Sequence, residues 1–343
     1  MGRLALVNGP FGKKKILLIA TGGTIASRPT ENGLAPQLGF EEIISCVPEI
    51  KQLADISAIQ LMNIDSSNLF WKHWLLLAEC IRENYNDYDG FVITHGTDTM
   101  AYTASALSYL VQNSKKPIVL TGSQKSIYVR DTDARNNLYN AFVYAVDPSA
   151  CLVHIVFEDK IIIGNRARKV KTKSYNAFLS VDFPEVGVVR DGKIIRYVDE
   201  VVAECQPTFY HKLNPKIFVL KLIPGLSLDV FKCLKLGYDA VIIESFGAGN
   251  LPLYEDDGFA SAIEDLVKCG KTVVITTQVP HEGSDMSVYE TGCTIKNKCG
   301  VIEAYDMTLE AVVAKLMWIL GQTDDDKKIK ELFYRPVQKD LII

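Results

Sequence analysis

Short apolar runs alternate along this chain with longer stretches in which apolar residues recur every three or four positions. The short runs are typical of buried strands, and we expect them at 15–20, 57–64, 90–94, 117–121 and 151–157. The helical spacing predicts helices over 69–85, 100–111 and 135–146. This alternation predicts right-handed βαβ units and a mostly parallel sheet flanked by helices.

The same alternation starts again in the second half of the chain. Strands are expected at 217–223, 240–246 and 272–278, with helices from 228, near 259–268 and at 309–320. Residues 186–198 are typical of an antiparallel hairpin that turns at Asp191-Gly192. We therefore predict an N-terminal α/β domain at 1–198 that carries the catalytic residues, a linker at 199–215, and a smaller parallel α/β domain at 216–343.

Polar residues follow four of the expected strands. The four strand ends are TGGT (21–24), NIDSS (63–67), THGTDT (94–99) and TGSQ (121–124). One such end is typical of a helix cap. Ligands of open parallel sheets bind beyond the carboxyl ends of the strands, so four such ends favour a site for a polar small molecule.

The first of these ends, TGGT, does not fit a phosphate site. It has no third glycine at dinucleotide-binding spacing and no Gly-Lys-Ser/Thr, and Pro29 and Pro36 prevent a helix from following. The glycines instead allow the backbone to approach a ligand closely. We expect residues 27–36 to form a flap, with Thr24 exposed at its hinge.

A threonine hydroxyl needs activation before it can act as a nucleophile. Thr97 lies beside Asp98, and the basic run GNRARKVKTK (164–173) offers lysines that would favour its deprotonation. Spacing alone leaves open which lysine enters the site, and whether the run is only a solvated loop. His95 follows a buried strand, where a structural role is the commoner one.

Composition narrows the function classes. The 343 residues carry a formal net charge of −4, which argues against nucleic-acid and membrane surfaces. The eight cysteines include no Cys-x-x-Cys, as expected of reduced thiols, and no zinc motif follows His281. No apolar run has the length of a membrane span or the form of a signal peptide. We expect a cytoplasmic protein without metal or cofactor.

Two segments together carry a specific resemblance. ATGGTIAS (20–27) and GFVITHGTDTMAYTA (90–104) are similar to the bacterial-type L-asparaginase family, closest to its cytoplasmic type I branch. The resemblance continues through NIDSS (63–67), KPIVLTGSQ (116–124), GNRARKVK (164–171), FGAGN (246–250) and DMTLEA (306–311). It implies hydrolysis of L-asparagine to L-aspartate and ammonia, some glutaminase activity, and a homodimer or homotetramer.

The resemblance also implies roles for individual residues. Thr24 resembles the nucleophile that forms an acyl-enzyme, and Thr97, Asp98 and Lys169 resemble the second catalytic group. Asp65, Ser66 and Ser67 resemble the residues that hold the substrate α-carboxylate, and Asp98 the partner of its α-ammonium. Gly23 and Gly96 complete the expected substrate-binding set. Asn250 is the candidate contact supplied by a neighbouring protomer.

Two departures from the family pattern stand out. Many relatives carry a tyrosine in the flap, whereas this chain has Leu34 there and no tyrosine between Thr24 and Tyr85. Thr97, Asp98 and Lys169 would then carry more of the activation, or Tyr289 or Tyr254 would replace the missing tyrosine. The ending YRPVQKDLII also lacks the Gly-Glu-Leu-Thr of many type I relatives.

Two other functions stay open at this point. One is the asparaginase-like subunit of a tRNA-dependent amidotransferase. Such subunits carry an extra N-terminal domain before the TGGT segment, and we disfavour this function because only twenty residues precede Thr21 here. The other is a catalytically weak amino-acid binding protein, which Leu34 alone favours. A Thr24→Ala variant separates an enzyme from a sensor.

Overall fold

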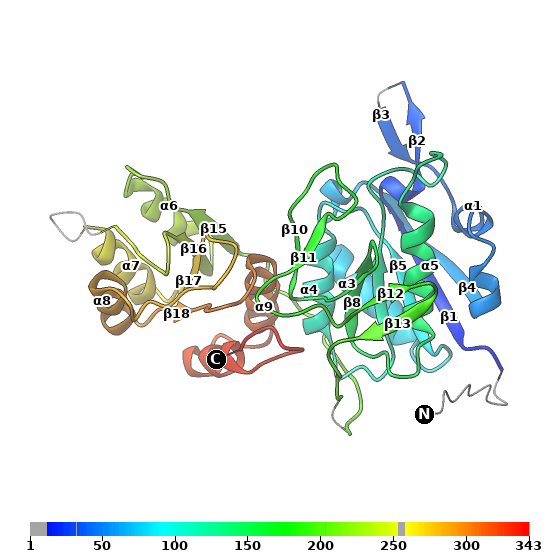
Figure 1. Cartoon of the computed structure of the whole chain (residues 1–343). Helices are drawn as coiled ribbons and strands as arrows, with labels where there is room; N and C mark the ends of the chain where they lie inside the picture. The colour runs from blue at the N-terminus through cyan, green and yellow to red at the C-terminus, as the bar shows by residue number, and fades with distance from the viewer. Residues whose placement is uncertain (1–11, 32, 203, 253–257, 343) are drawn as a thin grey trace, which may run out of the picture.

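The computed structural model describes residues 12–31, 33–202, 204–252 and 258–342, which form two α/β domains (Figure 1). The larger domain contains an eight-stranded sheet in the order β13-β12-β9-β8-β7-β5-β1-β4. Its strands are β1 (Lys15–Gly22), β4 (Asp55–Ile64), β5 (Gly90–Thr94), β7 (Ile118–Thr121), β8 (Val153–Phe157), β9 (Lys160–Ile163), β12 (Gly187–Arg190) and β13 (Lys193–Arg196). Strands β4, β1, β5, β7 and β8 are parallel, and the other three continue the sheet in antiparallel fashion.

Both faces of this sheet are buried, which explains its continuous apolar strands. Side chains alternate along β1: Leu17 and Ile19 pack in one core with α3 and α4, while Ile16 and Leu18 pack in a second core with α1, α2 and α5. These helices are α1 (Phe40–Ser45), α2 (Ile50–Leu53), α3 (Trp71–Asn84), α4 (Met100–Leu110) and α5 (Ala134–Ala145). The sheet is therefore the middle layer of three.

The smaller domain repeats this layering around a parallel sheet in the order β15-β16-β17-β18. Its elements are β15 (Ile217–Lys221), α6 (Asp229–Gly237), β16 (Ala240–Ser245), α7 (Gly258–Lys268), β17 (Thr272–Thr277), α8 (Glu290–Cys299), β18 (Ile302–Glu303), α9 (Leu309–Gln322) and α10 (Asp326–Tyr334). Helix α9 packs against α4, so one hydrophobic core runs through both domains. The predicted fold class of two α/β domains is confirmed.

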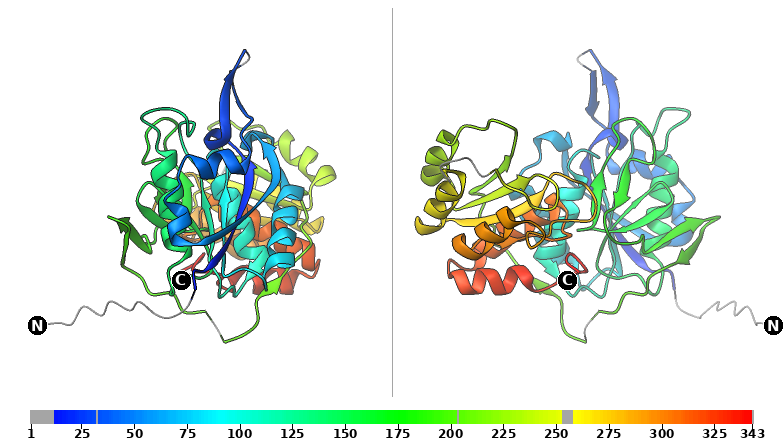
Figure 2. Two further views of the ribbon diagram at one scale, coloured as in Figure 1. Left: turned by 90° about the vertical axis from the view of Figure 1, so that its right-hand side faces the viewer. Right: turned by 60° about the vertical axis from the view of Figure 1, so that its left-hand side comes forward.

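Three short sheets lie outside the predicted elements. They pair β2 (Ser27–Thr30) with β3 (Gly33–Pro36), β10 (Ala167–Lys169) with β11 (Phe178–Ser180), and β6 (Val111–Gln112) with β14 (Thr208–Phe209). Strands of two to four residues are too short to show a period in the sequence. The expected flap is the β2–β3 hairpin, which projects from the body in both views of Figure 2. The boundaries of the linker at 199–215 stay a prediction.

Candidate active site

The four polar strand ends lie together, because β4, β1, β5 and β7 are adjacent and parallel. Thr24 begins the short helix η1 (Thr24–Ala26) after β1, and Ser66 begins η2 (Ser66–Asn68) after β4. Thr97 follows β5, and Gln124 follows β7. The edge that the sequence predicted for a polar site thus collects hydroxyl and amide groups from four strands.

Three of these ends touch at the level of the backbone. A Cβ atom on Gly23, whose φ is +78°, would lie 2.4 Å from the Cα of Gly96. A Cβ atom on Gly96 would in turn lie 2.5 Å from Oγ of Ser66. Only glycines permit this approach, so the backbone just before Thr24 lies against the backbone just before Thr97.

Lys169 reaches this edge from β10. Its Nζ donates hydrogen bonds to Thr97 Oγ1 at 2.8 Å and to Asp98 Oδ1 at 2.5 Å. The Lys169 side chain is only 16% exposed, while that of Asp98 is 65% exposed. Spacing along the basic run left the choice of lysine open, and the structure places Lys169 on the Thr97 hydroxyl. The ammonium there would stabilise negative charge that develops on Thr97.

Gln124 is a member of this group that sequence reasoning did not select. The Thr97 hydroxyl donates to Gln124 Oε1 at 3.2 Å. The amide nitrogen of Gln124 donates to the carbonyls of Lys171 and Ser174, so it also joins the β7 end to the loop after β10. Its position in TGSQ, the fourth polar strand end, is the feature of the sequence that could have identified Gln124.

Asp65 organises the end of β4. Its Oδ1 accepts hydrogen bonds from Ser67 Oγ at 2.7 Å and from Ser67 N at 2.8 Å, which lowers the pKa of the carboxyl. Ser66 is buried and Ser67 is exposed. The carbonyl of Ser66 accepts from Thr99 Oγ1 at 2.9 Å, which ties this end to the one that carries Thr97.

His95 is a structural residue. Its side chain is fully buried, with Nδ1 2.7 Å from the Gly96 carbonyl and Nε2 2.9 Å from Thr103 Oγ1. Burial lowers the pKa of His95 to about 4, so the ring is neutral at pH 7. Both ring nitrogens are engaged in these contacts, which support the backbone at Gly96.

Four residues considered in the sequence analysis lie away from this edge or outside the described part of the structure. Asn250 belongs to the smaller domain, where its backbone pairs with Phe246 and Thr291 donates to its side chain. These contacts keep Asn250 within the smaller domain, and none of them joins it to Thr97. Tyr289 precedes α8 and is 53% exposed. The side chain of Leu34 and the whole of Tyr254 lie outside the described residues.

The described residues contain no group of three histidines, cysteines or acidic residues arranged to hold a metal ion. Among the helices in the described part of the chain, none has the length and apolar character needed to cross a membrane.

Comparison with known proteins agrees with this geometry. Residues 15–202 match the family model "Asparaginase, N-terminal", and residues 216–333 match "Glutaminase/Asparaginase C-terminal domain". The chain belongs to the asparaginase family. Within that family it is 35% identical to an L-asparaginase of Thermococcus kodakarensis over 95% of this chain and 99% of the relative.

Other members of the asparaginase family are about equally similar in sequence. L-asparaginase 1 of Escherichia coli is 34% identical over 96% of this chain and 98% of its own. A glutamyl-tRNA(Gln) amidotransferase subunit of Thermococcus kodakarensis is 36% identical over 94% of this chain and 75% of its own. The solved thermostable L-asparaginase from Thermococcus kodakarensis superimposes with a TM-score of 0.91, at 34% identity, over 96% of this chain and 99% of the solved one.

Proposed function

We propose that this protein is an L-asparaginase that hydrolyses L-asparagine to L-aspartate and ammonia, with minor activity on L-glutamine. One observation carries the proposal: the Lys169 ammonium donates to the Thr97 hydroxyl and to Asp98, at the strand edge where Thr24 begins η1. Membership of the asparaginase family supports it as a second, independent line.

In the proposed reaction Thr24 is the nucleophile. Its hydroxyl oxygen attacks the side-chain amide carbon of asparagine, and its proton passes to the departing amine, which leaves as ammonia. The resulting ester on Thr24 is attacked by water, which releases aspartate and restores the hydroxyl. We propose that backbone N–H groups beside Gly23 and Gly96 stabilise the oxyanion that forms in both steps.

Thr97, Asp98 and Lys169 form the second catalytic group of this proposal. Lys169 donates to the Thr97 hydroxyl and stabilises negative charge that develops on its oxygen, and Asp98 balances the ammonium charge. Because Leu34 replaces the flap tyrosine of many relatives, we assign more of the activation to this group than to the flap.

Asparagine is a zwitterion, so its binding site needs hydroxyl donors and an acidic acceptor. The hydroxyls of Ser66 and Ser67 are proposed to bind the α-carboxylate, with Asp65 holding the turn in place. Asp98 is exposed and accepts the α-ammonium. A pocket distinguishes asparagine from glutamine by one methylene, about 1–3 kcal/mol, which is why some glutaminase activity is expected.

We further propose a homodimer or homotetramer in the cytoplasm. Asn250 lies in the smaller domain and would complete the site of a neighbouring protomer. The eight cysteines are all free, which suits a reducing compartment.

Ammonia release from L-asparagine and L-glutamine by the purified chain, with Thr24→Ala as control, tests the proposal. Release that the substitution abolishes supports a threonine amidohydrolase. A catalytically weak amino-acid binding protein would release no ammonia, but asparagine would still raise its melting temperature. The 36% identity to the amidotransferase relative keeps that function as a second candidate. Ammonia release that rises when a partner subunit and glutamyl-tRNA(Gln) are added would favour it over the asparaginase.

A further inference from the structure

Lys169 is carried by a two-stranded ribbon, β10–β11. Lys169 pairs with Phe178 at one end of the ribbon, and Ala167 pairs with Ser180 at the other. The base of the ribbon continues to Arg166, whose carbonyl accepts from the N–H of Val181 at 2.9 Å. Arg166 therefore stands one residue before the strand that delivers Lys169 to the site.

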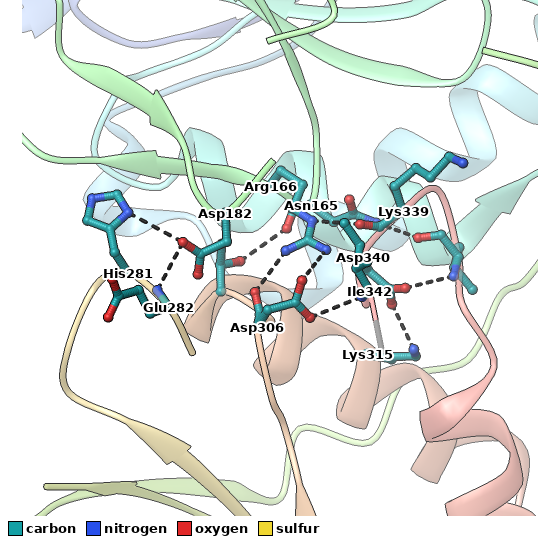
Figure 3. Close-up of polar contacts among 12 residues, drawn as sticks. Asn165, Arg166, Asp182, His281, Glu282, Asp306, Lys315, Lys339, Asp340 and Ile342 are labelled. Carbon is teal, nitrogen blue, oxygen red and sulfur yellow. Dashed lines mark hydrogen bonds and ion pairs between the residues drawn. The ribbon is translucent and has the colours of Figure 1, made fainter. Parts of the chain in front are cut away.

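The Arg166 side chain is fully buried and is held at three nitrogens (Figure 3). Nη1 donates to the carbonyl of Asp306 and Nη2 to its Oδ2, both at 2.8 Å. Nε donates to the carbonyl of Lys339 at 2.6 Å. The planar guanidinium fixes these bonds in one geometry, which a flexible ammonium would not do.

Asp306 joins this arginine to the end of the chain. Its second oxygen, Oδ1, accepts from the N–H of Ile342 at 3.0 Å. The segment 337–342 is itself anchored at Asp340, whose carboxylate pairs with Lys315 Nζ at 2.7 Å and accepts from Tyr109 OH at 2.9 Å. Lys315 and Asp340 are both completely buried. We call Arg166, Asp306 and residues 337–342 the C-terminal latch.

The other strand of the ribbon is tethered to the smaller domain as well. Asp182 follows β11, and its Oδ1 accepts from the N–H of Glu282 at 3.0 Å and lies 3.5 Å from Nδ1 of His281 (Figure 3). Both strands are thus held at the base of the ribbon, while Lys169 extends from its far end towards Thr97 and Asp98.

We propose that Arg166 is a positioning residue for Lys169 and that the C-terminal latch holds Arg166 in place. This inference rests on the proposed function, because it gives Lys169 a catalytic role. The Lys169 Nζ to Thr97 Oγ1 bond is 2.8 Å long, so a displacement of about 1 Å at the ribbon would break it. Misplacements of that size lower rates by up to about 10²-fold.

The test compares Arg166→Met with Arg196→Met. Arg196 is a matched control: it pairs with Asp147 at 2.7 Å and packs over the ring of Tyr144, as Arg166 pairs with Asp306 and packs over the ring of Phe183. Arg196 lies on β13, away from the ribbon. Both variants are assayed as full chains at a temperature below their melting temperatures. Relative to the wild type, Arg166→Met is expected to lower kcat at least about tenfold and to leave KM within about twofold. Hydrogen exchange should show lost protection over 166–181 in this variant only.

A drop in kcat no larger than that of Arg196→Met, or unchanged protection over 166–181, overturns the inference. If the wild type releases no ammonia, the proposed function fails, and hydrogen exchange still decides whether Arg166 holds the ribbon. If Arg166→Met does not fold, two variants at Ile342 replace it. Ile342→Pro removes the backbone N–H that donates to Asp306, and Ile342→Ala keeps that N–H. The kcat of Ile342→Pro should be at least about twofold lower than that of Ile342→Ala, and equal kcat values overturn the inference.

Discussion

The ammonium nitrogen of Lys169 lies 2.8 Å from the hydroxyl oxygen of Thr97, which is 72 positions earlier in the chain. Thr97 follows β5 of the large sheet, whereas Lys169 ends the short strand β10 of a separate two-stranded sheet. This contact puts a positive charge beside a threonine hydroxyl at a strand end, where it would stabilise negative charge that develops on the oxygen.

Removal of the Lys169 charge should stop turnover without unfolding the protein. Methionine retains most of the side-chain volume of lysine and cannot donate to Thr97. We expect Lys169→Met to lower kcat by roughly 10²–10⁴-fold, the range of a lost acid–base group. Steady-state kinetics measure this. Lys171→Met is the matched control, because Lys171 bonds Asn176 and should leave kcat nearly unchanged.

Gln124 should tune the same hydroxyl. Gln124→Met removes the acceptor of the Thr97 hydroxyl and both donors to the loop after β10. We expect kcat to fall about tenfold, the equivalent of about 1.4 kcal/mol, with a smaller change in KM. Gln322→Met removes an amide that also donates to two carbonyls, far from the site, and serves as control. Equal rates for the two variants would contradict a role for Gln124.

Gly96→Ala should damage the site by steric contact. The new methyl group would lie 2.5 Å from Ser66 Oγ and 2.6 Å from Ser66 Cβ, so one of the two strand ends must shift. Overpacking of this kind lowers stability by about 1–3 kcal/mol, and the proposed carboxylate site would move with Ser66. Denaturant unfolding and KM should both respond, whereas Gly237→Ala, where the methyl meets no atom within 4 Å, should change neither much.

His95 should make stability depend on pH. Burial lowers its pKa to about 4 in the folded protein, while the unfolded chain takes up the proton near pH 6.5. The contribution to stability is therefore complete above pH 6.5 and is lost as the pH falls towards 4, by about 3 kcal/mol in all. Denaturant unfolding from pH 7 to 4 measures it. His95→Gln should flatten this part of the profile, and His211→Gln, at an exposed position, should not.

The flap residue at position 34 tests how the nucleophile is activated. If Thr97, Asp98 and Lys169 carry the activation, then Leu34→Tyr, Tyr289→Phe and Tyr254→Phe should each leave kcat within about twofold. A large loss in one of the phenylalanine variants would instead identify a tyrosine that takes the place of the missing one. A clear gain in Leu34→Tyr would show that the flap limits the rate.

Local sequence was sufficient for many of the longer elements of this fold, although α8 and α10 were not predicted from it. Residues 16–20 form a buried strand because five apolar side chains in succession must be covered on both faces. The spacing of Trp71, Trp74, Leu75 and Ala78 is enough to predict the helix α3. The polar residues after four such strands also indicated the site edge, because parallel strands end on the same side of a sheet.

Tertiary structure decided which side chains meet at that edge. No spacing rule connects Lys169 or Gln124 to Thr97, since these contacts depend on how β10 and β7 lie beside β5. The ending of the chain had no periodicity to interpret, yet it packs between the domains and binds Arg166 and Asp306. Hydrophobic patterning acts over a few neighbouring residues, whereas a hydrogen bond between distant segments exists only once both have been placed.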